Sequence, residues 1–209
     1  MALLGPPPPL PPPEPATFHR FAQLAPKLLK QPSRTLLVAL LLAVLGLGAA
    51  QGQSDASKEY QIKAAFLYNF VQFVKWPSDS FGSANAPFCI GVLGDDPFDG
   101  ALEAIVRGEN IDSHRLMVEH ASRYEDLQDC QMIFVCKSEE GHLSEILSQL
   151  GSRPVLTVSE IDSFARNGGD IDFYLEGSKV RFEINPSSAR RSGLKISSQL
   201  LNLGRIVEP

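Results

Sequence analysis

Apolar side chains at helical spacing mark the first folded segment of the chain. Four of them within residues 57–76 recur at intervals of three or four residues: Ile62, Phe66, Phe70 and Phe73. This spacing puts them on one face of a helix. Pro77 ends the pattern, because proline disfavours a helical residue before it. We therefore expect a helix that buries this stripe, followed by a turn-rich loop over residues 78–86.

Short runs that are apolar at every position indicate buried strands. Parallel sheets, which are covered on both faces, contain such runs. Four predicted strands follow the first helix, at residues 88–93, 116–119, 132–136 and 154–157, and the first and third of them are apolar throughout. Between and after them, helical patterns occupy residues 98–106, 139–150 and 159–166. Strands that alternate with helices predict β-α-β units and a parallel sheet.

The pattern changes in the last 40 or so residues. Residues 171–175 and 180–184 flank the turn 176–179 and predict an antiparallel hairpin. Asn185 and Pro186 then read as the cap and first turn of a helical region, and Ile196, Leu200, Leu203 and Val207 continue at helical spacing. The complete pattern predicts an α/β fold: a three-layer α/β/α sandwich with a mixed, mostly parallel sheet.

Residues 1–50 differ in composition from the rest of the chain. Eight of the 16 prolines lie within the first 15 residues, where they preclude a packed core. Basic residues then precede an apolar run over 36–47 that ends in Gly48-Ala49-Ala50, the layout of a secretory signal peptide cleaved after Ala50. The alternative is an uncleaved membrane anchor, although a membrane span needs ~18 or more apolar residues. We therefore expect residues 51–209 to form a single exported, periplasmic domain.

Charge excludes one class of partner. The chain has a net charge of -5, and residues 51–209 carry 15 Lys and Arg against 23 Asp and Glu. Such an acidic surface repels phosphates, so we expect no binding to nucleic acid and no docking on anionic lipid. The hydrophobic fraction of 44% is sufficient for a packed core.

The exported part contains three cysteines, so it can form at most one internal disulfide. Cys130 and Cys136 bracket one predicted strand, which separates them by ~20 Å when it is extended, whereas a disulfide needs Cα atoms within about 7 Å. Cys89 begins the first core strand and Cys130 precedes the third, so these two can meet if the strands are neighbours. We expect the pair Cys89–Cys130 and a buried free thiol at Cys136. The alternative is three reduced thiols.

Known catalytic patterns are missing from the sequence. Residues 94–99 read GDDPFD at a strand-to-helix junction, the usual ligand crevice of parallel sheets. We interpret Asp95 and Asp96 as helix caps, and an unfamiliar enzyme site that also uses Asp99 is the alternative. The three histidines of the exported part show no metal-ligand spacing: His114, His120 and His142. We therefore predict no catalytic residue, no metal ligand and no cofactor.

Candidate partner-binding residues fall into two groups. Tyr68, Phe73 and Trp76 lie on or beside the first helix and offer aromatic surface for a partner; the alternative is that they cover the sheet. The second group is basic within an acidic domain: Arg181, Arg190 and Arg191. These three suit an acidic partner loop, or they are ordinary solvated charges.

Three motifs in order resemble those of the YfiR-like family of periplasmic proteins. They are KAAFLYNF at 63–70 with KWP at 75–77, VSEIDSF at 158–164 with VRFEIN at 180–185, and GLKISSQLL at 193–201. The resemblance spans roughly residues 59–207 and so covers the whole predicted domain. The family pattern also has a later cysteine pair, which this chain lacks after Cys136. Redox switching by that pair is therefore not expected here.

The resemblance implies a non-catalytic repressor. It would bind the periplasmic sensor domain of an inner-membrane diguanylate cyclase and so lower cyclic-di-GMP and biofilm formation. It also implies an outer-membrane lipoprotein that can sequester the repressor, and a homodimer. The alternative is a periplasmic small-ligand-binding protein that uses the crevice beyond residues 93–95 and has no cyclase partner.

Overall fold

The computed structural model describes residues 50–208, so the predicted signal peptide lies outside the described residues except for Ala50. The α-helices are α2 (Ala50–Phe73), α3 (Ala101–Val106), α4 (Leu143–Leu150), α5 (Pro186–Arg191) and α6 (Ser198–Leu201). Three short 3-10 helices are η1 (Ser78–Ser80), η2 (Tyr124–Leu127) and η3 (Lys137–His142). The strands are β1 (Val74–Lys75), β2 (Phe88–Leu93), β3 (Asn110–Ile111), β4 (His114–Ala121), β5 (Met132–Val135), β6 (Leu156–Ser159), β7 (Ile171–Glu176), β8 (Lys179–Ile184), β9 (Lys195–Ile196) and β10 (Arg205–Ile206).

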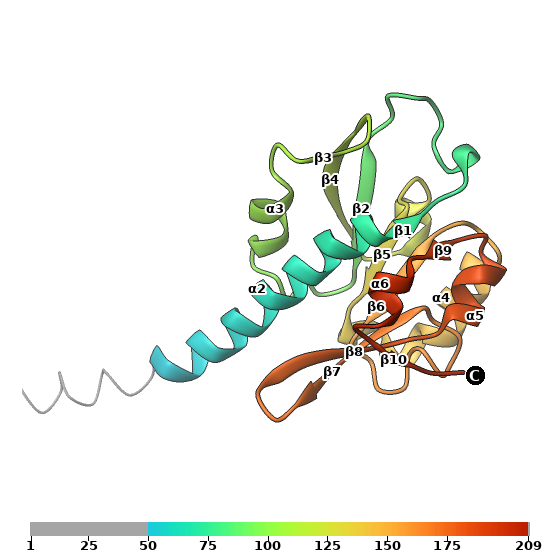
Figure 1. The fold of residues 1–209 in the computed structure, drawn as a ribbon. Helices are drawn as coiled ribbons and strands as arrows, with labels where there is room; N and C mark the ends of the chain where they lie inside the picture. Colours follow the sequence, from blue (N-terminus) through green and yellow to red (C-terminus); the bar gives the residue numbers. More distant parts are fainter. Residues whose placement is uncertain (1–49, 209) are drawn as a thin grey trace, which may run out of the picture. The chain divides into compact units, whose positions relative to one another are not determined.

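Eight strands form the main sheet in the order β10-β8-β7-β6-β5-β2-β4-β3 (Figure 1). Strands β4, β2, β5, β6 and β7 are parallel to one another. Strands β7 and β8 form the antiparallel hairpin, in which Glu176 pairs with Lys179. The short strands β1 and β9 pair separately. The predicted mixed, mostly parallel sheet with a hairpin near the C-terminus is confirmed.

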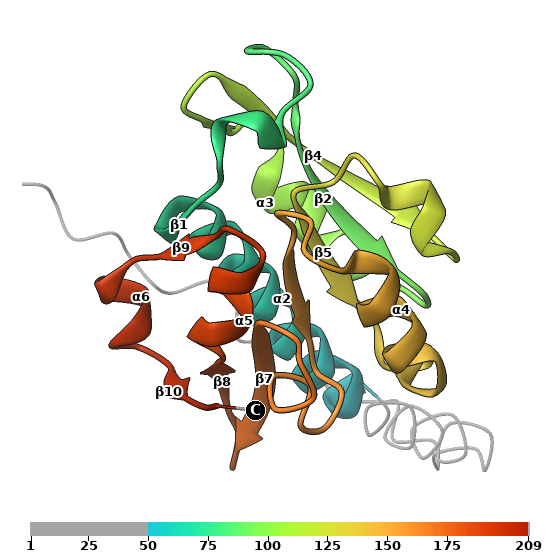
Figure 2. The ribbon, with the colours of Figure 1, turned by 90° about the vertical axis from the view of Figure 1, so that its right-hand side faces the viewer.

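The central strands bury both of their faces, which produces three layers. In β2, Ile90 and Val92 belong to one apolar cluster, while Cys89 and Leu93 belong to another. This alternation follows from the two-residue period of a strand. The first cluster packs under α2, α3, α5 and α6, and the second under α4 and η2. Figure 2 shows α2 and α4 on opposite sides of β5.

The buried face of the first helix differs from the predicted stripe. Ile62 is 46% exposed, and Phe66 and Phe73 are only partly buried. The fully buried face is one residue further around the helix, at Lys63, Ala64, Leu67, Phe70 and Val71. The spacing alone did not reveal this rotation, because Lys63 reads as a polar position and yet lies inside the protein.

The helix predicted over 159–166 is wrong, because this segment is a series of turns. Ser163 has a φ of 62°, which interrupts an α-helix of L-residues. The Ser159 hydroxyl accepts a hydrogen bond from the Ile161 N–H at 3.0 Å and bends the chain directly after β6. The predicted helix over 139–150 begins later, as α4, because η3 occupies the preceding residues. Within α4, Leu147 is only partly buried.

The predicted N-cap of α3 and the predicted helix at the end of the chain also differ from the structure. The N-cap of α3 is Gly100, with a φ of 79°, rather than Asp95 or Asp96. The Asp96 carboxylate instead accepts a hydrogen bond from the Phe98 N–H at 2.8 Å. Residues 196–207 form β9, α6 and β10 rather than one helix, and Leu203 is 69% exposed.

Cys89 and Cys130 form the predicted disulfide, with their Cα atoms 4.4 Å apart. The pairing is possible because β2 and β5 are neighbours in the sheet, with Ile90 opposite Met132. Cys136 is free and buried, as predicted, and burial raises the pKa of its thiol to about 12. This thiol is therefore protonated and unreactive at neutral pH.

Reduction of the disulfide should lower the free energy of unfolding by about 2–4 kcal/mol, because the open chain gains conformational entropy when it unfolds. Urea denaturation with and without reductant measures the change. Cys136→Ser should respond to reductant as the wild type does, whereas Cys89→Ala/Cys130→Ala should not respond. Thiol titration of the unfolded, unreduced chain should find one free thiol. Three free thiols would contradict the pairing.

Candidate functional site

The carboxyl ends of β2, β5 and β6 form the edge of the sheet where a ligand crevice is expected. From β2 the chain continues to β4 on one side of the sheet, whereas from β5 it continues to β6 on the other. Ligands of parallel α/β sheets bind where the strand order reverses in this way. The loops after β2, β5 and β6 therefore define the candidate site.

The loops after β2 and β5 approach each other closely at this edge. The N–H of Asp95 donates a hydrogen bond to the Ser138 hydroxyl at 2.9 Å, which joins the loops that follow β2 and β5. Gly94 has a φ of 98°, and a Cβ atom there would lie 2.7 Å from Oε1 of Glu139. The glycine permits this close approach of the two loops. Ser138 and Glu139 therefore occupy the space directly beside Gly94, whereas a pocket of about 290 Å³ lies next to these loops, lined by residues that include Leu93, Arg123 and Glu139.

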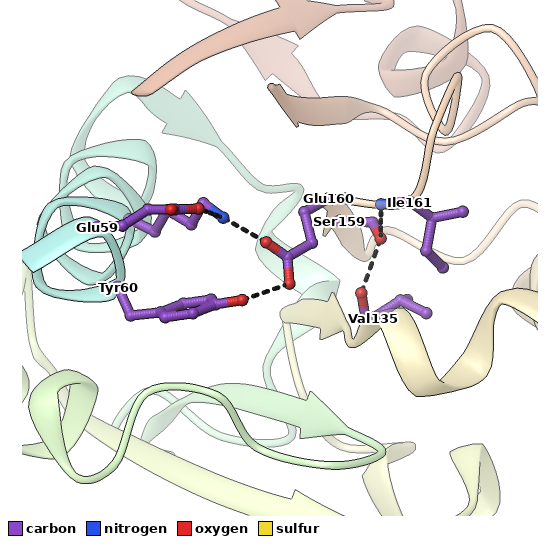
Figure 3. A network of polar contacts seen from close by, with 7 residues as sticks. Glu59, Tyr60, Val135, Ser159, Glu160 and Ile161 are labelled. Atoms are coloured by element: carbon purple, nitrogen blue, oxygen red, sulfur yellow. Dashed lines mark hydrogen bonds and ion pairs between the residues drawn. The ribbon is translucent and has the colours of Figure 1, made fainter. Parts of the chain in front are cut away.

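A buried ion-paired network occupies the same edge (Figure 3). Lys63 of α2 is 3% exposed at its side chain and pairs with Glu59 and with Glu160. The Tyr60 hydroxyl donates a hydrogen bond to the other carboxylate oxygen of Glu160 at 2.9 Å. Burying a charge without partners costs free energy. Lys63 can face the sheet because these contacts offset that cost. We call Glu59, Tyr60, Lys63 and Glu160 the Lys63 network.

The position of Glu160 depends on the end of β6. The Ser159 hydroxyl donates to the backbone carbonyl of Val135 at 2.7 Å, and this bond ties β6 to β5. Glu160 is the next residue and faces α2 (Figure 3). Burial and the Glu160 carboxylate raise the pKa of Tyr60, so its hydroxyl stays protonated and remains a donor. The network therefore locks α2 to the carboxyl edge of the sheet.

The Lys63 network was not predicted from the sequence. Its two halves are separated by 97 residues between Lys63 and Glu160, so no local motif contains them. The one available signal was a lysine beside the apolar stripe of a helix, and a lysine there ordinarily extends into solvent.

The predicted aromatic residues do not form an exposed patch. Tyr68, Phe73 and Trp76 are all partly buried against the same core cluster. The indole N–H of Trp76 donates to the Gln131 carbonyl at 2.9 Å, and its ring meets that of Phe88 edge-on at 4.8 Å. This geometry favours the interpretation that these side chains cover the sheet.

The predicted basic residues are all exposed, but they lie on two elements. Arg181 belongs to β8 and pairs with Glu176 at 3.1 Å. Arg190 and Arg191 lie in the last turn of α5. Arg191 lines a pocket of about 720 Å³ between α4 and α5, together with Ser144, Asn167 and Ser188. The pocket between α4 and α5 is thus away from the crevice that the sequence suggested.

Two buried carboxyl groups carry raised pKa values. Burial raises the pKa of Asp170 to about 6 and that of Asp172 to about 7. Hydrogen bonds from the backbone N–H groups of Phe164 and Ala165 partly oppose the rise at Asp172. Both residues lie at the start of β7, under the turns that replace the predicted helix. They form part of the folded core rather than of the crevice.

These features define a class of protein. The fold is a three-layer α/β domain with a buried, ion-paired lysine at the carboxyl edge of its sheet. The model of the YfiR/HmsC-like family matches residues 60–205, and the chain belongs to this family. The family consists of periplasmic, non-catalytic regulators of diguanylate cyclases. No helix within residues 50–208 has the length and apolar character needed to cross a membrane.

Replacing Lys63 should be strongly destabilising. Lys63→Met should lower the free energy of unfolding by about 3 kcal/mol, because it leaves Glu160 buried without its cation. Lys63→Met/Glu160→Gln should recover most of the loss. Lys58→Met is the matched control on the same helix, since Lys58 is 69% exposed and pairs only with Asp55. Urea denaturation measures all three variants. Equal stabilities of Lys63→Met and Lys58→Met would contradict the role of the network.

Asp172 should make the chain less stable as pH rises. Its pKa is about 7 in the folded chain against 3.8 for the free side chain. The unfolded chain therefore loses the proton first, and stability falls between about pH 4 and pH 7. Asp172→Asn should remove this part of the pH dependence, whereas Asp129→Asn, at an exposed aspartate that does not contribute to the pKa of Asp172, should not. Urea denaturation across this range tests the difference, and parallel curves for wild type and Asp172→Asn would refute it.

Proposed function

We propose that this chain is a periplasmic repressor that binds the periplasmic sensor domain of an inner-membrane diguanylate cyclase and lowers cyclic-di-GMP. The single observation that carries the proposal is the family match over residues 60–205. The loops at the edge where a parallel sheet ordinarily binds a substrate support it, because Ser138 and Glu139 occupy the space directly beside Gly94. A non-catalytic role is part of the proposal.

Repression works by a shift of population. The repressor binds the inactive arrangement of the sensor domain more tightly than the active one, and so draws the cyclase toward the inactive state. A shift from 99% active to 99% inactive needs a preference of roughly 10⁴-fold. A well-ordered binding surface favours such a preference, and the Lys63 network and the disulfide both limit movement of the fold.

The proposed binding surface is basic. Arg190 and Arg191 are exposed at the end of α5, and Arg181 is exposed on the hairpin. In a domain with excess acid, these side chains attract an acidic loop of the partner. Tyr68, Phe73 and Trp76 would contribute only their partly exposed edges. An outer-membrane lipoprotein that competes for the repressor, and a homodimer, belong to the same proposal.

A second candidate function is small-ligand binding. The pocket between α4 and α5 has about 720 Å³, a volume within the range of small-molecule sites. Arg191 and the serines of its lining suit a small polar anion. A ligand that binds the folded chain raises its melting temperature, so a thermal-shift screen of polar metabolites distinguishes this function. A ligand without any cyclase partner would favour it over repression.

The main proposal predicts that deletion of the gene raises cyclic-di-GMP and that the tagged chain co-purifies with a membrane cyclase from periplasmic and membrane extracts. Mass spectrometry and nucleotide quantification measure the two outcomes. A catalytically dead cyclase should abolish the rise that follows deletion. Unchanged cyclic-di-GMP together with the absence of a cyclase among the captured proteins would contradict the proposal.

Charge reversal tests the proposed surface. Arg190→Glu/Arg191→Glu should weaken binding to the cyclase about tenfold or more, because it places like charges against the acidic partner loop. Arg123→Glu is the matched control: Arg123 is also exposed but lies before η2, paired with Asp126. Pull-down affinity and cyclic-di-GMP report the effect. Equal binding by both variants would exclude this surface.

A further inference from the structure

Three side chains that can ligate a metal converge beside the carboxyl end of β2. Asp96, Glu103 and His120 each present a ligand atom, and these atoms all lie within 4.8 Å of one another. Asp96 is in the loop after β2, Glu103 is on α3 and His120 is on β4. His120 is the register partner of Val92, whose side chain faces the α3 side of the sheet.

The contacts within this cluster are unbalanced in charge. Nε2 of His120 lies 2.5 Å from Oε1 of Glu103, and Nδ1 lies 3.6 Å from Oδ2 of Asp96. Oδ1 of Asp96 is occupied by the Phe98 N–H, which leaves Oδ2 directed at the cluster. Within residues 50–208, His120 is the only basic side chain in ion-pair contact with either carboxylate. With a neutral imidazole, the two carboxylates have no cation.

Glu103 gives a second, independent indication. Its Oε2 atom is buried and has no hydrogen-bond partner among the described residues. A buried acceptor without a partner costs about 1–3 kcal/mol, so native structures rarely leave one unused. A cation bound to this carboxylate through either oxygen lowers that cost.

We propose that Asp96, Glu103 and His120 bind one divalent transition-metal ion, with Zn²⁺ as the preferred ion. An imidazole with two carboxylates suits Zn²⁺, whereas Mg²⁺ and Ca²⁺ prefer sites made entirely of oxygen. Water completes the coordination at the exposed side. The nitrogen of His120 that binds the ion must be unprotonated, and in a neutral ring its proton moves to the other nitrogen.

Binding of one ion requires the side chains to rearrange, because Nε2 of His120 faces Glu103 whereas Nδ1 faces Asp96. Metal–ligand distances of about 2.0–2.2 Å require the donor atoms to lie farther apart than the 2.5 Å between His120 and Glu103. The His120 side chain is 42% exposed, so its ring is free to turn. The other group with ligand spacing is Cys89, Glu119 and Cys130, but its two sulfur atoms are joined in the disulfide and offer no thiolate.

Spacing in the sequence did not predict this site. The three ligands come from a loop, a helix and a strand, and they match none of the known short metal motifs. Only the packing of α3 against β4 brings Glu103 to His120. The proposal therefore departs from the expectation that none of the histidines ligates a metal.

Isothermal titration of the purified, chelator-treated full chain with Zn²⁺, without reductant, tests the proposal. We expect saturable binding of one ion and a higher melting temperature. His120→Ala and Asp96→Asn should each weaken binding about tenfold or more. His142→Ala is the matched control, since His142 is 69% exposed and lies 3.5 Å from a single carboxylate, Glu139.

Several results would overturn the site. They are the absence of saturable Zn²⁺ binding by the wild type, unchanged binding by His120→Ala, and equal affinity for Mg²⁺ and Zn²⁺. Circular dichroism establishes that each variant is folded. His120 is exposed enough for its alanine variant to fold, so the test does not depend on the carboxylate variants. Cyclase repression is measured separately, and neither result decides the other.

Discussion

The burial of the Lys63 ammonium is the constraint on which the arrangement of this domain depends. A lysine that is 3% exposed at its side chain is tolerated only with compensating charges, and these come from Glu59 on the same helix and Glu160 after β6. The requirement sets the rotation of α2, so that Ile62 faces solvent while Leu67 and Phe70 face the sheet. It also holds the helix over the carboxyl edge of the sheet, beside the loops after β2 and β5. One charge thus connects the orientation of the helix to the position of Glu160 at this edge.

Much of the fold could be predicted because it rests on short-range patterns. The strands β2 and β5 are apolar at every position, and this pattern is typical of strands that are covered on both faces. Their adjacency then made the Cys89–Cys130 disulfide predictable. The errors arose where one residue overrides a pattern. Ser163, with a left-handed backbone, prevents the helix expected after β6, and Gly100 rather than an aspartate caps α3.

The sites were harder to predict than the fold, for a physical reason. Lys63 and Glu160, like Glu103 and His120, meet only after the sheet has formed, so the sequence carries no local record of them. The exposed arginines were visible in the sequence, but their separation onto β8 and α5 was not. Aromatic residues near the first helix read as binding surface, and Trp76 instead hydrogen-bonds to the Gln131 carbonyl. Residue type alone indicated the candidate binding residues, whereas their contacts in the folded chain determine what each of them does.

This chain belongs to the YfiR/HmsC-like family of regulators, and its proposed function is repression of a cyclase through binding. The most direct measurement is a titration of the intact cyclase, reconstituted in vesicles with its sensor domain outward, with the purified chain. Cyclic-di-GMP synthesis should fall to a plateau as the chain saturates the sensor domain, and a cyclase without that domain should be unaffected. Synthesis that stays constant at saturating concentrations of the chain would contradict the account.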